Sequence, residues 1–225
     1  MQTLRDLAAL FKLRETPLYI VGGCIRDKLV LNHAVFDIDI TSALTPAQVE
    51  NLLGGSEFSI TKSNPKLGYL QITNGIQRWD YTTFRKDTYK KSGNYFHVKI
   101  KFVKSIRQDA KRRDFTINAI YCDILTGKLR FFFGAKRHMR KRIMHTCKKP
   151  GRSFREDALR IPRLVRFCSK LYFSPSQKTF EAAYKYKHLM QNIPDAYLER
   201  EIAKFPPEAK SSGLHKLLMT EITDK

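Results

Sequence analysis

The residues of this chain best suited to chemistry lie close together near its N-terminus. Asp37 and Asp39 alternate with apolar residues in Phe36–Ile40, so a strand here places both carboxylates on one face, about 6 to 7 Å apart. Two like charges on one face are unfavourable unless a cation lies between them, and carboxylate oxygens suit Mg²⁺. The pair predicts a magnesium site.

A pair of glycines precedes these carboxylates. Leu18–Val21 is typical of a buried strand and Cys24–Leu31 has a helical pattern, so Gly22 and Gly23 form the turn between them. Glycine lets the backbone approach a ligand closely, and the N–H groups at a helix start, with Arg26 nearby, suit phosphate. A tight turn and a solvated strand edge are the plain alternative, but the order and spacing favour a metal-dependent phosphoryl-transfer centre.

Further elements must complete the sheet that holds these residues. The pattern predicts a helix at Thr45–Leu53, with Thr45 as its N-cap, and then strands at Phe58–Ile60, Tyr69–Thr73 and Ile76–Phe84, the last two joined by a two-residue turn at Asn74-Gly75. Asp80 falls inside the last strand, where a carboxylate is unusual unless it faces a cation. It is therefore a candidate third carboxylate, the alternative being an exposed strand residue.

The following stretch is predicted to be less regular. Lys86–Phe96 is polar and indicates a mobile loop, while His97–Val103 has a strand pattern and Ser105 begins a helix that reaches Arg113. In Lys111–Ile120, which reads KRRDFTINAI, charges stand beside an apolar, hydroxyl-bearing turn. A basic helix end explains this simply. The sharper hypothesis is that Arg113 and Asp114 contact nucleotide phosphate or ribose, supported by Asn118.

The composition points to a polyanionic partner. There are 42 Lys and Arg against 21 Asp and Glu, a formal charge of +21, although a merely solubilising or ribosomal-type basic surface is the alternative. Between residues 124 and 155 no acidic residue occurs among eleven Lys and Arg, which favours bound phosphates. No apolar run is long enough for a membrane span. Four scattered cysteines fit a reducing, cytoplasmic setting, and Met1–Arg14 is expected to be a packed helix rather than a targeting helix.

The C-terminal part has a helical pattern that repeats charge. Asp157, Arg160, Arg163 and Arg166 recur every three residues, so consecutive members would meet on one helix surface. They form either a salt-bridge ladder or a set that recognises bases. In the second case a carboxylate accepts the exocyclic amino group of cytosine or adenine, which guanine and uracil do not offer in that place. Pro162 is expected to kink the helix unless it lies in the first turn.

Three of these stretches resemble one family. Leu18–Ile40, the KRRDFTINAI stretch and Glu156–Phe167 resemble the motifs of the class II tRNA nucleotidyltransferases and bacterial poly(A) polymerases. The resemblance extends over almost the whole chain, whereas relatives continue into further helical parts. It implies an α+β fold, with a polymerase-beta-like nucleotidyltransferase head, a mixed sheet flanked by helices, over 1–138 and an all-α neck over 139–225.

The resemblance also implies an activity. The chain would add CMP and AMP to the 3′ end of tRNA without a template, using CTP, ATP and two Mg²⁺ held by Asp37 and Asp39. Poly(A), CC-only and A-only addition share these motifs, and a non-catalytic RNA-binding protein is the alternative of another class. The implied nucleotide-binding residues are Gly22, Gly23, Arg26, Arg113, Asp114, Asn118, Asp157, Arg160, Arg163 and Arg166, with Asp80 beside the metal ligands.

Overall fold

The chain folds into two compact units. The computed structural model describes residues 2–32, 37–89, 93–94 and 98–219. The first unit comprises residues 1–87, 100–112 and 118–132, and the second comprises 88–99, 113–117 and 133–225. Packing thus divides the chain near residue 133 and assigns two earlier segments to the second unit. The boundary at 138/139 between a catalytic and a base-recognising part stays a prediction about function.

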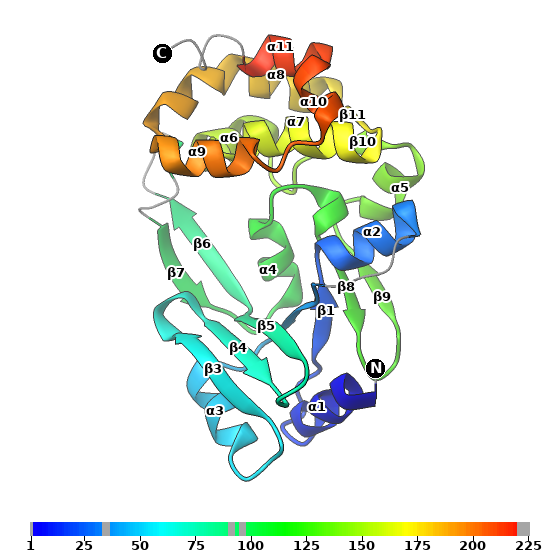
Figure 1. The fold of residues 1–225 in the computed structure, drawn as a ribbon, viewed down its shortest axis with the longest axis vertical. Coiled ribbons are helices and arrows are strands. Elements are labelled where there is room, and N and C mark those ends of the chain that lie inside the picture. The colour runs from blue at the N-terminus through cyan, green and yellow to red at the C-terminus, as the bar shows by residue number, and fades with distance from the viewer. Residues whose placement is uncertain (1, 33–36, 90–92, 95–97, 220–225) are drawn as a thin grey trace. The chain divides into compact units, whose positions relative to one another are not determined.

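A mixed sheet forms the centre of the first unit (Figure 1). Its described strands, in spatial order, are β3 (Ser59–Asn64), β4 (Tyr69–Thr73), β5 (Arg78–Thr83), β2 (Asp39–Ser42), β1 (Tyr19–Val21), β8 (Ile120–Asp123) and β9 (Leu129–Phe131). Only the β2–β5 pair is parallel, and the other neighbours are antiparallel. The mixed sheet expected for the head is confirmed.

Helices complete the first unit. They are α1 (Gln2–Lys12), α2 (Gly23–Leu31), α3 (Pro46–Leu53) and α4 (Ile106–Arg112). The predicted N-cap of α3 is confirmed, since Thr45 forms a capping box with Gln48. Leu7 and Phe11 of α1 pack with Val49 of α3 and with Leu70 and Tyr81 of the sheet in one apolar core. The N-terminal helix is therefore a packed element.

Two predicted strand boundaries in the first unit are wrong. The strand expected at Phe36–Ile40 begins only at Asp39, and Asp37 precedes it in irregular backbone, while Phe36 lies outside the described residues. The alternation of side chains therefore does not place Asp37 and Asp39 on one face. The hairpin between β4 and β5 has a four-residue turn, Asn74–Gln77, in which the Asn74 carboxamide caps the turn by accepting from the backbone N–H groups of Ile76 and Gln77. This Asx-type turn replaces the two-residue turn.

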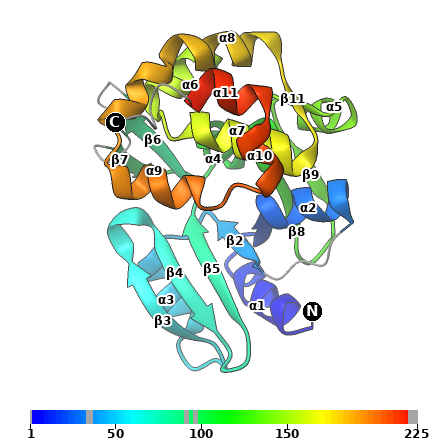
Figure 2. The same cartoon turned by 45° about the horizontal axis from the view of Figure 1, so that its top comes forward.

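The second unit is mainly helical, as predicted. Its helices are α5 (Ala135–Arg140), α6 (Pro150–Glu156), α7 (Arg160–Leu171), α8 (Gln177–Tyr186), α9 (Asp195–Ile202), α10 (Pro207–Ser211) and α11 (Gly213–Met219). Two short parallel strands, β10 (Ile143–Met144) and β11 (Ser174–Pro175), join α5 to α8. Helix α7 contacts α6, α9, α10 and α11 (Figure 2), so it is the central element of the unit. No helix in the described ranges is long and apolar enough to cross a membrane.

The charged repeat does not lie on one helix. Helix α6 ends at Glu156, Asp157 has extended backbone at φ −156, and α7 begins at Arg160. Pro162 is the third residue of α7, in the first turn, where its missing N–H has no helical partner to lose. The prediction that all four charged residues lie on one helix surface is therefore wrong, and Pro162, which lies in the first turn, does not break α7.

The loop expected at Lys86–Phe96 is partly regular. Its first residues belong to β6 (Arg85–Tyr89), which pairs with β7 (Val98–Phe102) in a two-stranded sheet. Residues 90–92 and 95–97 lie outside the described ranges. Gly93 is held in place, since its N–H donates to the Arg155 carbonyl at 2.7 Å and its carbonyl accepts from the Ala158 N–H at 2.8 Å. These two bonds flank Asp157 in sequence.

We expect Gly93→Ala to destabilise the protein by about 2 to 4 kcal/mol, combining left-handed strain with overpacking. Gly93 has φ +79, and an added Cβ would lie 2.9 Å from Leu189 and 3.0 Å from Ala158. Gly127→Ala is the matched control, because Gly127 has φ +69 and open space around its Cα. Denaturant unfolding of both variants measures the difference. Equal destabilisation by the two would contradict tight packing at Gly93.

Candidate functional site

The glycine turn in the first unit has a backbone that demands glycine. Gly22 is the N-cap of α2 with φ 85 and ψ −133, a region that other residues enter only at high cost. Its N–H donates to the Ile120 carbonyl at 3.3 Å, which fixes the turn to β8. The next N–H groups of α2 start a nine-residue helix, whose dipole favours an anion at this end.

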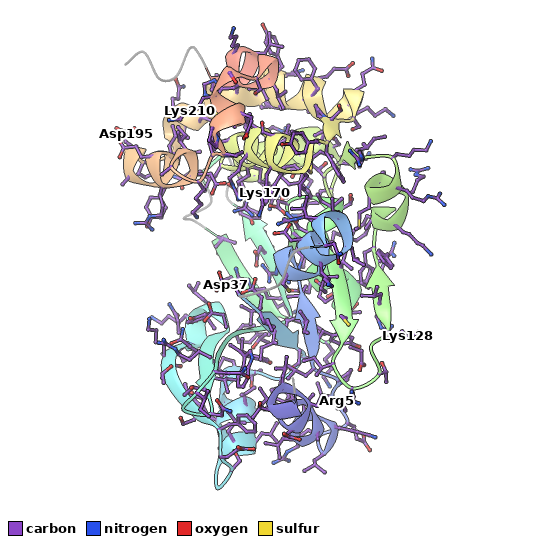
Figure 3. The ribbon with its side chains drawn as sticks, turned by 45° about the vertical axis from the view of Figure 1, so that its right-hand side comes forward. Arg5, Asp37, Lys128, Lys170, Asp195 and Lys210 are labelled. Atoms are coloured by element: carbon purple, nitrogen blue, oxygen red, sulfur yellow. The ribbon has the colours of Figure 1, made fainter. Side chains whose placement is uncertain are left out.

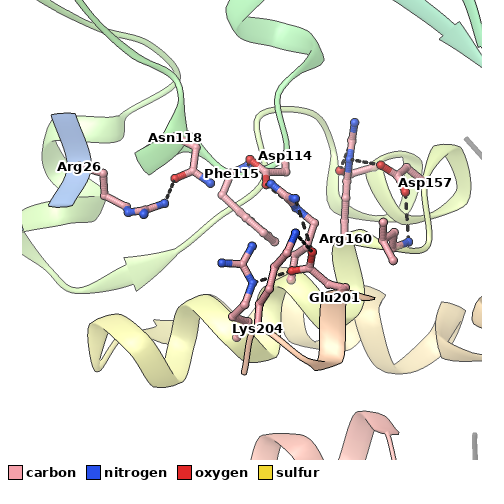
Figure 4. Close-up of polar contacts among 12 residues, drawn as sticks. Arg26, Asp114, Phe115, Asn118, Asp157, Arg160, Glu201 and Lys204 are labelled. Carbon is pink, nitrogen blue, oxygen red and sulfur yellow. Dashed lines mark hydrogen bonds and ion pairs between the residues drawn. The ribbon is translucent and has the colours of Figure 1, made fainter. Parts of the chain in front are cut away.

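Arg26 folds back over this turn. A Cβ on Gly23 would lie 3.4 Å from the Arg26 Nη2 atom, an ordinary van der Waals contact, so the guanidinium packs directly over this glycine. Arg26 is 4% exposed, donates to the Asn118 Oδ1 at 2.6 Å and pairs with Asp27 at 2.7 Å (Figure 4). The structure therefore brings together three predicted residues, Gly23, Arg26 and Asn118, at the start of α2.

Two predicted carboxylates lie directly opposite each other on the sheet. Asp39 begins β2 and is in register with Asp80 on the parallel strand β5, so both side chains leave the same face. Asp80 accepts hydrogen bonds from the Tyr69 hydroxyl at 2.8 Å and the Gln71 amide at 3.2 Å. Asp37 is exposed two residues before Asp39 (Figure 3). Tyr69 and Gln71 were not predicted, because only the register of β4 shows that they face Asp80.

The electrostatics of this cluster suit a cation. Burial, with the carboxylates of Asp80 and Asp39, raises the pKa of Tyr69 to about 12. Burial and the Asp39 charge raise the pKa of the Cys24 thiol to about 11. Both groups are held neutral beside concentrated negative charge. Among the described residues no three acidic, histidine or cysteine side chains are placed to hold a metal alone. Two carboxylates completed by substrate phosphates are a usual donor set for Mg²⁺, so the residues fit it.

The second unit holds a separate charged cluster. Asp114 is buried and accepts from the Phe115 N–H at 2.7 Å and from Arg163, whose Nε and Nη2 donate to the Asp114 Oδ2 at 2.9 and 2.7 Å. Arg113 is half-buried beside it. The carboxylate therefore fixes the arginine of α7, which raises the pKa of Arg163 despite its burial. This pairing across the sequence was not predicted.

Asp157 and Arg160 are the one pair of the charged repeat that meets as predicted. Arg160 Nε lies 3.4 Å from the Asp157 Oδ2, and Arg160 Nη1 donates to the Ser153 hydroxyl at 2.7 Å. Burial raises the pKa of Asp157 although Arg160 and Arg163 act to lower it. Arg160 is 3% exposed, whereas the side chains of Asp157 and Arg163 are 17% and 33% exposed. Asp157 and Arg163 therefore offer more surface to a ligand.

Glu201 of α9 is a functional candidate that sequence reasoning missed. It is 3% exposed and accepts from the Arg166 Nε at 2.5 Å, with Arg163 and Lys204 each at 3.9 Å (Figure 4). One buried carboxylate thus orients two arginines of the predicted repeat. No local pattern signals this, because Glu201 lies 35 residues from Arg166 in an ordinary helical sequence.

A cleft of about 580 Å³ lies elsewhere in the first unit. Tyr19, Leu44 and Phe84 are among the residues that line it, with Arg14 and Lys104. Tyr19 begins β1 and Leu44 follows β2, so the cleft is at the opposite end of these strands from Gly22 and Asp39. None of the predicted site residues lines it, and it takes no part in the candidate site.

The amino-acid sequence matches one protein family and several known proteins. Residues 18–145 match the family described as the poly A polymerase head domain. The chain is 31% identical to the CCA-adding enzyme of Bacillus subtilis over 92% of this chain and 51% of that protein. It is 34% identical to the CCA-adding enzyme of Ligilactobacillus salivarius, over 97% of this chain and 53% of that protein.

A solved structure agrees with these matches. The crystal structure of the Bacillus stearothermophilus CCA-adding enzyme in complex with CTP has a TM-score of 0.81 and 30% identity, over 95% of this chain and 51% of that one. The chain thus spans about half the length of the curated relatives it matches.

Proposed function

The chain belongs to the poly(A) polymerase head-domain family, and we propose from this that it is a template-independent RNA nucleotidyltransferase. It adds CMP and AMP to the 3′ end of a tRNA and releases pyrophosphate. The observation that carries the proposal is the register of Asp39 opposite Asp80, which provides two carboxylates for a metal. The Gly22 turn in the same unit provides N–H groups for a phosphate. The names of the relatives support CCA addition as the first choice.

In this mechanism the first unit holds the reacting groups. Asp37 and Asp39, with Asp80 beside them, would hold two Mg²⁺, which supply Lewis-acid chemistry by lowering the pKa of the RNA 3′-OH and neutralising the leaving pyrophosphate. The helix start at Gly22 and Gly23 binds the triphosphate. Arg26 adds a guanidinium whose direction is set by Asn118. No protein side chain has to act as a base.

The second unit selects the base in this proposal. Ionised Asp157 accepts a hydrogen bond from the exocyclic amino group of CTP or ATP. Arg163 donates a hydrogen bond to a ring nitrogen or carbonyl oxygen of the same base. Arg160 orients Asp157, while Asp114 and Glu201 orient Arg163 and Arg166. Arg113 and Asp114, from the KRRDFTINAI stretch, also contact the phosphate or ribose of the nucleotide. UTP and GTP are rejected because they present a carbonyl to the carboxylate.

The proposal is tested by incubating the protein with Mg²⁺, single nucleotides or mixtures, and a tRNA that lacks its 3′ end, and by sequencing the products. We expect termination at C-C-A. Long A tracts would make the protein a poly(A) polymerase, and C-C or a single A would mark a split activity. No extension of a tRNA that is still bound tightly would favour a non-catalytic RNA-binding protein.

The setting of this activity is proposed to be the cytoplasm. All four cysteines, Cys24, Cys122, Cys147 and Cys168, are free, which fits a reducing compartment where RNA is processed.

A further inference from the structure

A strongly basic surface in the second unit has no part in the proposed chemistry. Five cations in seven residues of α5 and the turn after it are exposed, and we name them the α5 cation strip: Lys136, Arg137, Arg140, Lys141 and Arg142. None of the five forms an ion pair with another described residue. Figure 3 shows nitrogen-tipped side chains leaving α5 for solvent.

Some other cations of the same unit form ion pairs. Lys148 and Arg152 pair with Glu156, Arg160 pairs with Asp157, and Arg166 pairs with Glu201. The α5 cation strip has no acidic residue within its sequence neighbourhood from 124 to 155. Five exposed like charges repel one another, and bound anions relieve this repulsion.

A buried histidine holds the helix that carries the strip in place. His138, between the strip residues of α5, is buried, and its Nδ1 lies 2.9 Å from the Thr116 hydroxyl. Its ring stands 5.1 Å from that of His145, which bonds the Ser176 hydroxyl at the start of α8 at 2.8 Å. Burial lowers the pKa of both histidines, and Arg137 acts on both while Lys178 of α8 acts on His145. The positive surface therefore extends from α5 to the start of α8.

An exposed aromatic ring adjoins the strip. Tyr172 is 71% exposed and has a left-handed backbone at φ 54. The Ser174 N–H donates to the Arg142 carbonyl at 3.0 Å where β11 pairs with β10, so Tyr172 stands beside the end of the strip. A solvent-exposed ring beside cations is a platform on which a nucleic-acid base can stack.

We propose that the α5 cation strip and Tyr172 form an RNA-binding surface that contacts the phosphate backbone outside the nucleotide site. Residues three and four apart on α5 lie about 5 to 6 Å apart, which lets neighbouring cations reach successive phosphates of one strand. Tyr172 stacks on an unpaired base at the edge of the strip. The inference rests on the proposed function for the identity of the polyanion, and it adds a surface for it.

The strip is tested by replacing its cations with a neutral, polar side chain. We expect the quadruple variant Lys136→Gln, Arg137→Gln, Arg140→Gln and Lys141→Gln to weaken binding of a tRNA lacking its 3′ end by about tenfold or more near 0.15 M salt, because counterion release is lost. The slope of log Kd against log salt falls by about two to four for the same reason. Fluorescence anisotropy between about 50 and 200 mM salt measures both.

The control variant removes the same number of exposed Lys and Arg from the first unit: Lys12→Gln, Arg14→Gln, Lys62→Gln and Arg78→Gln. If the strip contacts the RNA, this control variant keeps the wild-type affinity for tRNA and most of the slope of log Kd against log salt. Equal effects of the two variants would overturn the strip as a binding surface. So would unchanged RNA binding with lost binding to anionic phospholipid vesicles, which would assign the strip to a membrane instead.

Two further measurements complete the test. Tyr172→Asn, which suits the left-handed backbone, is expected to weaken binding about tenfold with an unchanged salt slope, whereas Tyr172→Phe keeps the ring and the affinity. Equal affinities of the two variants would overturn stacking. Incorporation at saturating RNA separates the two proposals, because the strip variant keeps kcat and raises KM. If the wild-type protein incorporates nothing, the proposed function fails while the binding comparison still decides the strip.

Discussion

Asp39→Asn is expected to reduce nucleotide incorporation by about a thousandfold or more, because electrostatic stabilisation of a transferring phosphoryl group is a large part of such catalysis. The substitution keeps the size of the side chain and removes the charge that lies opposite Asp80 at the start of β2. Asp39 is exposed, so no packing is lost. Removal of one of two like charges leaves the melting temperature unchanged or slightly higher.

Single-turnover incorporation and thermal unfolding with and without Mg²⁺ measure these effects. Stabilisation of the wild-type protein by Mg²⁺ with CTP is expected to be lost in Asp39→Asn, a readout that needs no turnover. Glu50→Gln, at an exposed position on α3 of the same unit, is the control that keeps both. An Asp39→Asn variant that incorporates normally would overturn the metal assignment.

Asp157→Asn is expected to lower discrimination against UTP and GTP by about tenfold to a hundredfold, as befits the loss of one or two selective hydrogen bonds. An ionised carboxylate only accepts, whereas a carboxamide also donates and can pair with the carbonyl of uracil or guanine. The variant also leaves the Arg160 guanidinium without its partner charge at 3.4 Å, so the melting temperature should fall as well.

The same carboxylate predicts a pH dependence. Burial raises the pKa of Asp157, so its proton is taken up at a higher pH than that of an ordinary aspartate. The ionised form, which accepts from CTP and ATP, dominates above this pKa and declines as the pH falls through it. Selectivity for CTP and ATP should therefore weaken on the acid side.

Competition between CTP and UTP over about pH 5 to 8 measures this dependence. Asp157→Asn removes the titrating group, so its lower selectivity should not change with pH. Lys62→Gln, at an exposed position on β3, is a control outside the base cluster and should keep the wild-type profile. Selectivity of Asp157→Asn equal to that of the wild-type protein would contradict base recognition by Asp157.

The features that were predicted correctly depend on local sequence. Gly22 and Gly23 mark a turn because few other residues adopt its backbone, and Thr45 with Gln48 identifies a helix start through hydrogen bonds within four residues. Asp80 was singled out because a carboxylate inside a strand is unusual, and it lies on β5 opposite Asp39, while its role in a site stays a prediction. In each case the energetic reason lies within a short stretch of chain, which a single sequence displays.

The features that were missed depend on contacts between distant residues. Spacing suggested that Asp157, Arg160, Arg163 and Arg166 bond one another, but buried Asp114 and Glu201 take two of the arginines instead. A full carboxylate partner stabilises a half-buried guanidinium better than a neighbour on the same helix. Likewise, two backbone hydrogen bonds flank the break at Asp157: the Ala158 N–H donates to the carbonyl of Gly93, 65 residues away, and the Gly93 N–H donates to the Arg155 carbonyl.

The backbone hydrogen bonds of Gly93 limit how this protein can be re-engineered. Its two backbone bonds act as a fixed point inside the segment that joins β6 to β7, at Arg155 on one side and Ala158 on the other. A segment grafted here from a relative must therefore match two separate lengths, one from residue 89 to the glycine and one from the glycine to residue 98. A library that varies only the total loop length would mostly contain sequences with the glycine at the wrong position. In those sequences the glycine could not form its two backbone hydrogen bonds with the turn that contains Asp157.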